Sequence, residues 1–299
     1  MSFYNRPALK IEEQINYFKN HGLKVISEEN FKKILSRISF FRFREYLAPL
    51  IQKSDNVNEN DVVSLYIFDH RLRIILFEAI KIVEVALRTQ IVQNYATKYG
   101  PFGYSDHENF NNKFKHNMWI EKAQKDINNK KNNHQAIKDF YDKYENQYLP
   151  LWIFAEYATF GSLSLMMKGM HTADRKNISK YFGIQHQIFI NWIHVLVYIR
   201  NICAHHSRLW NLKLKIPPVH LEKNIGKIEK IYINNNKIFS VINIILYILL
   251  KIESPITNRY KENIFEAMNG ICFFNINDLQ KTMGFIENWK KSIIWKEQL

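Results

Sequence analysis

Apolar residues recur every three or four positions along most of the chain, which is the spacing of a helix with one buried face. The longest such segment starts at Asp61 and ends at Gly100-Pro101. Its apolar positions are Phe68, Leu72, Ile75, Leu76, Ala79, Val83, Ala86, Leu87 and Ile91. No sustained alternation of apolar and polar residues, the pattern of a half-buried strand, is present. The pattern therefore predicts an all-α protein.

Proline at a helix start and glycine at a helix end mark several further helices. They are predicted from Pro7 to Gly22, after Ser27, from Ile38 to about Leu50, from Pro150 through Met166, from Asp174 to Gly183, from Gln185 to about Trp210 and from Ile238 to Ile252, with shorter ones beyond, the last holding Trp289 and Trp295. Pro49 should end or bend its helix. The polar stretch Lys125–His134 is interpreted as a helix end, a mobile loop or a seam between domains.

Composition supports the helical interpretation. Only 9 Gly and 7 Pro occur in 299 residues, too few for the many turns of a sandwich or barrel. Two cysteines, Cys203 and Cys272, make no disulfide framework and are expected to be reduced thiols. The N-terminus has no signal peptide pattern, and the longest apolar run, Ile238–Ile252, falls short of the about twenty residues that a bilayer span needs. We expect a soluble, cytoplasmic protein without a membrane partner.

The charge gives the first indication of function. Lys and Arg number 42 against 28 Asp and Glu, so the net charge is +14, and the pI is about 9.5. Such an excess attracts polyanions, of which nucleic acid is the commonest inside cells. A bland alternative is that lysine enrichment reflects an AT-rich genome, with no partner involved.

The segment 200–208 has the densest group of catalytic residue types in the chain. It contains Arg200, Asn201, His205, His206 and Arg208. If the helix continues to Trp210, Asn201, His205 and Arg208 share one face, while Arg200 lies about 140° from His205. The carboxyl end of a helix also favours a positively charged imidazole.

This set of side chains suits RNA cleavage, because RNA supplies its own nucleophile, the 2′-hydroxyl. One group must remove the hydroxyl proton, another must protonate the leaving 5′-oxygen, and a cation must face the phosphate. One helix supplies only one or two histidines, so two copies facing across a two-fold axis would complete the site. From spacing alone, a structural histidine and a chance match are the commoner explanation.

Several segments together resemble the abortive-infection proteins of the AbiD/AbiF kind. The strongest is Arg200–Trp210, RNICAHHSRLW, which is similar to the R-x4-6-H motif of HEPN ribonucleases. The other matching blocks are Ile38–Arg42, Leu65–Arg73, Glu84–Arg88, Leu149–Trp152 and Phe160–Leu163. The resemblance spans roughly residues 10 to 215, in order, and the last 80 or so residues carry no recognisable motif.

The resemblance implies an all-helical HEPN-like bundle and a metal-independent endoribonuclease whose composite site forms in a homodimer. It implies a toxin of phage defence, often held in check. On this chain, Arg200 is then the phosphate-facing arginine, His205 the acid/base and Asn201 the orienting residue. His206 is a second candidate, because the motif tolerates a longer gap. We therefore expect a domain over 1–215, with helices 1–60 preceding core helices 61–215, and a helical extension over 216–299 that packs on the core.

Other basic positions are candidates for RNA binding. Arg42 and Arg44 alternate with aromatic residues, as on RNA-stacking surfaces, although buried rings with outward arginines explain the pattern equally. Arg208, Lys213 and Lys215 would border RNA bound at the motif. A lysine run, interpreted either as a backbone track or as a solvated face, comprises Lys113, Lys115, Lys122, Lys125, Lys130 and Lys131.

No metal or cofactor is expected. His205 and His206 reach no tetrahedral ligand spacing with His186, His194 or His220, and no phosphate-binding glycine loop is present. Three hypotheses follow: a HEPN endoribonuclease of phage defence, an RNA-binding protein in a stable particle with a structured noncoding RNA, and a helical protein-interaction factor.

Overall fold

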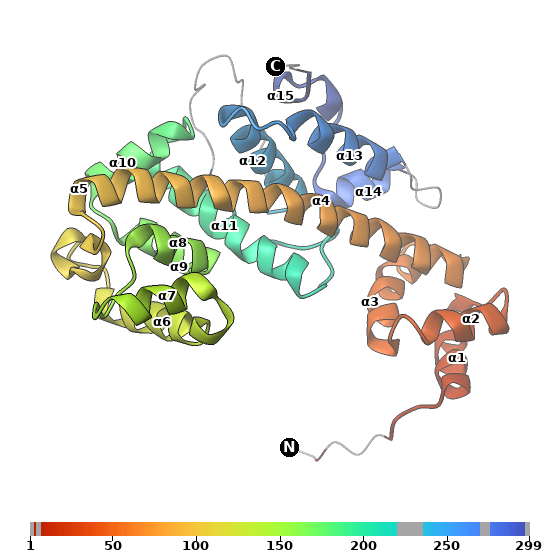
Figure 1. The fold of residues 1–299 in the computed structure, drawn as a ribbon. Coiled ribbons are helices and arrows are strands. Elements are labelled where there is room, and N and C mark those ends of the chain that lie inside the picture. The colour runs from red at the N-terminus through yellow and green to blue at the C-terminus, as the bar shows by residue number, and fades with distance from the viewer. Residues whose placement is uncertain (1–2, 4–6, 220–235, 270–275, 297–299) are drawn as a thin grey trace.

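The computed structural model describes residues 3, 7–219, 236–269 and 276–296. Cys272 and His220, which entered the predictions above, lie outside these residues. Helices α4, α11 and α12 form the centre of the fold, and the all-α prediction is confirmed. In Figure 1, α4 crosses the middle of the molecule, with α12–α15 on one side, α6–α9 on the other near its carboxyl end, and α1–α3 at its amino end.

Helix α4 (Glu59–Ile91) begins at a capping box. The Asn58 side chain accepts hydrogen bonds from the amides of Asn60 and Asp61, and Asp61 accepts from the amide of Asn58. These reciprocal bonds satisfy amides that lack helical partners. The helix continues through the π-helical segment η1 (Val92–Ala96) and α5 (Thr97–Tyr99) to Gly100, whose φ of 77° ends it. Both predicted ends of this helix are therefore correct to within two residues.

The amino-terminal helices are α1 (Ile11–Asn20), α2 (Glu28–Leu35) and α3 (Phe40–Ile51). Helix α1 starts later than predicted, because Glu13 caps the amide of Lys10 rather than Pro7 opening the first turn. Pro49 lies inside the last turn of α3. The two-residue strands β1 (Leu23–Lys24) and β2 (Val57–Asn58) pair in parallel beside them.

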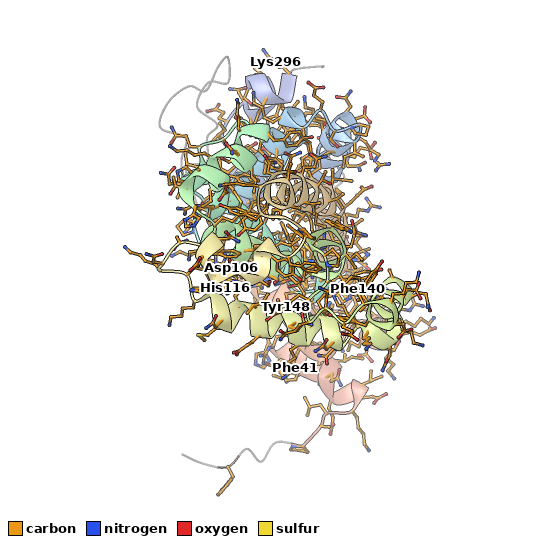
Figure 2. The ribbon with its side chains drawn as sticks, turned by 60° about the vertical axis from the view of Figure 1, so that its left-hand side comes forward. Phe41, Asp106, His116, Phe140, Tyr148 and Lys296 are labelled. Carbon is orange, nitrogen blue, oxygen red and sulfur yellow. The ribbon has the colours of Figure 1, made fainter. Side chains whose placement is uncertain are left out.

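A second group of helices follows α5. It comprises η2 (Gly103–Ser105), η3 (His107–Asn109), α6 (His116–Asn128), η4 (Lys131–Asn133), α7 (Gln135–Lys143), α8 (Leu151–Tyr157) and α9 (Phe160–Gly169). Figure 2 views the molecule from this side, with the labelled His116, Phe140 and Tyr148 on the group. The single helix predicted from Pro150 is wrong, because Ala158 and Thr159 are extended and the Thr159 side chain caps α9. The polar stretch after α6 is a helix end followed by η4.

The remaining helices are α10 (Thr172–Tyr181), α11 (His186–Ala204), α12 (Ile238–Lys251), α13 (Thr257–Asn269), α14 (Ile276–Met283), η5 (Trp289–Lys291) and α15 (Ile293–Lys296). Helix α12 is buried on every face and packs against α4 and α11. Among the described residues, no helix has the length and apolar character to cross a bilayer. One continuous apolar core extends from Ile15 to Trp295, and the predicted division near residue 215 stays a prediction.

Candidate functional site

The carboxyl end of α11 carries the predicted motif. The helix ends at Ala204, six residues before the predicted end, in a Schellman turn. The amide of Ser207 donates to the carbonyl of Ile202, and the amide of His206 donates to that of Cys203. His206 occupies the left-handed position of this turn with a φ of 56°. Arg208 therefore does not share a helical face with Asn201 and His205, contrary to the prediction.

Within the motif, Asn201 and His205 do lie one turn apart on one face. The amide of His205 donates to the carbonyl of Asn201 at 3.0 Å, so helical geometry persists to His205. Arg200 Nη1 lies 3.3 Å from Asn201 Oδ1, and its guanidinium lies 5.9 Å from the centroid of the Phe77 ring on α4. Asn201, His205 and His206 are exposed, whereas Arg200 is half-buried. The motif thus offers exposed acid–base groups beside a partly shielded cation.

The loop after the motif is fixed by a buried carboxylate on α4. Asp69, which is fully buried, accepts hydrogen bonds from the amides of Leu209 (3.1 Å) and Trp210 (2.6 Å). The same carboxylate accepts from the Tyr46 hydroxyl of α3 at 2.5 Å and pairs with Arg73, one turn further along α4. We call Tyr46, Asp69 and Arg73 the Asp69 network. It joins three parts of the chain that are far apart in sequence.

Burial dominates the electrostatics of this network. It raises the pKa of Asp69, while the hydrogen bond from Tyr46 and the charge of Arg73 oppose that rise. Burial, reinforced by the Asp69 charge, also raises the pKa of Tyr46, so its hydroxyl remains a donor at neutral pH. Burial raises the pKa of the Cys203 thiol, on the inner face of α11, to about 12. Cys203 is therefore an unreactive core residue rather than a nucleophile.

Two of the predicted RNA-binding arginines have acceptors within the chain. Arg42 donates to the carbonyl of His206 at 3.0 Å, and Arg208 donates to the carbonyl of Glu45 on α3. Together they tie α3 to the loop that follows α11. Arg44 is exposed and lies over the Phe41 ring at 5.3 Å. Figure 2 labels Phe41, which is 64% exposed.

Lys213 and Lys215 are exposed on the segment that follows Trp210. Trp210 itself is a core residue, with 1% of its surface exposed. The lysine run of the sequence divides in the structure. Lys130 donates to the carbonyl of Tyr157 and Lys131 lies over the Tyr141 ring, whereas Lys113, Lys115 and Lys122 face a cleft.

That cleft, with a volume of about 1460 Å³, begins at the motif. Arg200 and Asn201 form part of one wall, and α6, α9 and the start of α10 supply the rest. We call it the motif cleft. Its cationic lining residues are Lys113, Lys115, Lys122, Lys168, Arg175 and Arg200, against one carboxylate, Asp126. His171 and His194 also line it, whereas His205 lies just beyond its end.

Two features of this site were not predicted from the sequence. The role of Asp69 was missed, although Asp69 and Arg73 stand at i,i+4 in a block that carries the family resemblance. The motif cleft was missed because it joins residues from four helices. The lysine run was its one visible sign in the sequence.

Comparison with known proteins gives one match. A family model described as Abi-like protein matches residues 33–211, more than half of the chain. The matched region runs from α2 through the motif to the residues that the Asp69 network anchors. No curated protein and no solved structure matches the chain.

Proposed function

The chain belongs to the Abi-like protein family, and from this premise we propose that it is a metal-independent endoribonuclease that acts as a toxin in abortive infection of phage-infected cells. One observation carries the proposal. Arg200 and Asn201 line a cationic cleft, and His205 follows one helical turn later on the same face of α11. A phosphate bound at the mouth of the cleft would thus have a guanidinium, an amide and an imidazole beside it.

The proposed reaction needs only these groups and RNA. A base takes the proton of the 2′-hydroxyl, the 2′-oxygen bonds to phosphorus, and the bond from phosphorus to the 5′-oxygen breaks. An acid returns a proton to that oxygen, so the products carry a 2′,3′-cyclic phosphate and a 5′-hydroxyl. Arg200 stabilises the added charge on the phosphorane oxygens, because a guanidinium pairs with two oxygens at once. His205 transfers the proton, and Asn201 holds Arg200 in place.

A second copy of the chain would supply the second imidazole. Each motif presents one His205, and His194, two turns before Asn201 on α11, lies about 16 Å from His205 along the helix axis. That distance is too long for His194 and His205 of one chain to serve one phosphate, and His206 stands in the left-handed turn after the helix rather than on the face of Asn201 and His205. We therefore propose that the active form is a homodimer in which two α11 ends face each other.

The test is cleavage of RNA in the presence of a chelator. His205→Ala should lower the rate by about 10²–10⁴-fold, the contribution of a positioned acid or base, and Arg200→Ala by about 10²–10³-fold, the cost of losing one charge-stabilising group. Each variant should abolish toxicity in cells. A substrate with a 2′-deoxynucleotide at the cleavage position should not be cut there. Lys138→Ala, an exposed change on α7 outside the cleft, is the control. Full activity of both motif variants would refute the proposal.

A second function is favoured by the charge of the motif cleft. Six cations against one carboxylate, in a chain of net charge +14, suit a stable particle with a structured noncoding RNA. In such a particle the RNA would cover Arg200 and His205 and suppress cleavage. Purification from the native locus at moderate salt, followed by sequencing of any bound RNA, tests this. One discrete RNA at fixed stoichiometry supports the particle, and protein free of nucleic acid excludes it.

A further inference from the structure

The motif cleft extends well beyond the residues that the proposed chemistry uses. Asn201 and His194 both line it and are seven residues apart on α11, which corresponds to about 10 Å along the helix axis. The cleft therefore leads from the motif towards the amino end of α11, away from His205. Its far walls are α6 and the start of α10. A single phosphate at Arg200 would fill only one end of it.

Among the described residues, the cations of the cleft form no ion pair with a carboxylate. Within the described ranges, none of the six takes part in an ion pair, although Lys19, Lys32, Lys33, Arg73, Arg88, Lys98 and Arg259 do. Like charges gathered in a concave site repel one another and attract counter-ions. The site therefore favours a ligand that brings several negative charges.

In the part of the chain that the structure describes, three polar atoms of the lining are buried and have no hydrogen-bond partner. They are the Nε atoms of Arg175 and Arg200 and the Oγ of Ser162. A buried polar atom without a partner costs free energy that a ligand with oxygen acceptors can recover. Thr159, Phe160 and Gly161 at the amino end of α9 also line the cleft, and amides at a helix start attract anions.

Part of the cleft lining is apolar. Phe114, Met118 and Leu165 line it, and Met118 and Leu165 expose 66% and 41% of their surface. An inorganic anion or an acidic peptide would leave this surface unused. Unpaired bases would cover it, because every base has an apolar face while the strand carries a charge at each phosphate.

We propose that the motif cleft holds a single strand of RNA that continues from the phosphate bound at Arg200 towards His194. The phosphates of the strand contact Lys113, Lys115, Lys122, Lys168 and Arg175, and its bases rest on Phe114, Met118 and Leu165. This inference rests on the proposed function, since it places the substrate strand next to the scissile phosphate. It also assigns a preference for unpaired over duplex RNA, because a duplex hides the base faces.

Binding and cleavage must be measured separately to test it. The probe is a short fluorescein-labelled oligouridylate, and its affinity is measured by anisotropy with the His205→Ala protein, which does not cut it. On that background, Lys122→Glu combined with Lys168→Glu should weaken binding at least tenfold. It should also flatten the dependence of log Kd on log salt by about 0.7 for each lost phosphate contact. An equally long RNA hairpin should bind less tightly than the single strand.

The matched control is Lys138→Glu combined with Lys143→Glu, which makes the same charge change on α7 outside the cleft. It should change the affinity less than twofold. Equal losses from the two double variants would mean that the protein senses only net charge, and the cleft proposal would be overturned. Circular dichroism melting of each variant excludes a folding defect as the cause.

A second readout locates the strand directly. Ultraviolet crosslinking of 4-thiouridine RNA, followed by mass spectrometry, should yield adducts within 111–126 and 159–168. Adducts confined to α3, around Arg42 and Arg44, would show that the RNA binds elsewhere and would refute the cleft proposal. If His205→Ala still cut RNA, the proposed function would fail, and binding would then be measured with a 2′-O-methyl oligouridylate, which has no 2′-hydroxyl to attack. If cleavage depended on His205 but the cleft variants bound normally, only the cleft proposal would fail.

Discussion

Basic residues lie on both sides of the α11 carboxyl end, but their surroundings differ. On the α3–α4 side, Arg42, Arg73 and Arg208 all donate to carbonyl or carboxylate oxygens of the chain itself. On the cleft side, Lys122, Lys168 and Arg175 have no ion-pair partner among the described residues. The first set holds the motif loop in place, and the second leaves its charge available to a ligand.

This contrast shows what the net charge alone does not. A cation that donates to oxygens of the chain itself contributes to stability, because removing it takes a donor away from those acceptors. A cation that faces like charges contributes little to stability and is retained for what it binds. The motif lies between the two sides. Arg200 contacts the Phe77 ring of α4 and also lines the cleft.

The largest effect should come from removing the carboxylate of the Asp69 network. Asp69→Ala leaves Arg73 as a buried charge and frees the amides of Leu209 and Trp210, so it should lower the free energy of unfolding by about 3–5 kcal/mol. The matched change on the cleft side, Asp126→Ala, should stay within about 0.5 kcal/mol. Urea denaturation measures both. If the two variants lost similar amounts of unfolding free energy, the proposed difference between the α3–α4 side and the cleft side would be wrong.

Arg208→Ala should have the next largest effect. It removes a charged donor from the exposed Glu45 carbonyl and should cost about 1–1.5 kcal/mol of stability, whereas Lys122→Ala should cost less than about 0.5 kcal/mol. The reverse order should hold for RNA affinity, with Lys122→Ala the weaker binder. If the Arg208→Ala protein kept its stability but lost RNA binding, the result would instead support the prediction that Arg208 contacts RNA.

His206→Gly should raise stability, because the left-handed position of the Schellman turn suits glycine. Relief of that backbone conformation should add about 1 kcal/mol to the free energy of unfolding. Cleavage should persist if His205 is the proton-transfer group. A variant that is more stable but inactive would assign that role to His206.

The smallest effect concerns Cys203, which faces the Asp69 network. With Cys272→Ser in place, Cys203 should resist iodoacetamide at pH 8 in the folded protein and react after unfolding. Because its folded pKa of about 12 lies above its ordinary value of 9.0, the unfolded chain loses this proton first as pH rises. The thiol therefore makes stability fall from about pH 9 upward. Rapid labelling of the native protein would contradict its burial.

Local signals predicted the helices where periodicity and capping agreed. Asn58 caps the start of α4, and Gly100 ends α5, the last segment of the same continuous helix, as their residue types favour. Helix α11 was predicted too long because Leu209 and Trp210 continue the apolar spacing, and because His206 occupies a position where glycine is the usual stop signal.

The candidate site was likewise predicted only where its residues are close together in the sequence. Arg200, Asn201 and His205 could be picked out because they lie within one helix and share a motif. The hydrogen bond from Trp210 to Asp69 joins residues about 140 positions apart, and no local pattern encodes it. Likewise, the sequence shows Lys122 as one of many lysines. Only the packing of α6 against α9 directs it towards the motif.

The Asp69 anchor has a consequence for how such proteins diversify. Asp69 accepts hydrogen bonds from the main-chain amides of residues 209 and 210 and not from their side chains. The exposed side chains of His206 and Ser207, between the helix end and that anchor, can therefore be exchanged without moving the loop, whereas His205 is the proposed proton-transfer group. Under the proposed function, such exchanges would alter which RNA is recognised there while the scaffold stays the same. A single buried carboxylate thus fixes the main chain of the loop, while the exposed side chains of the loop remain free to change.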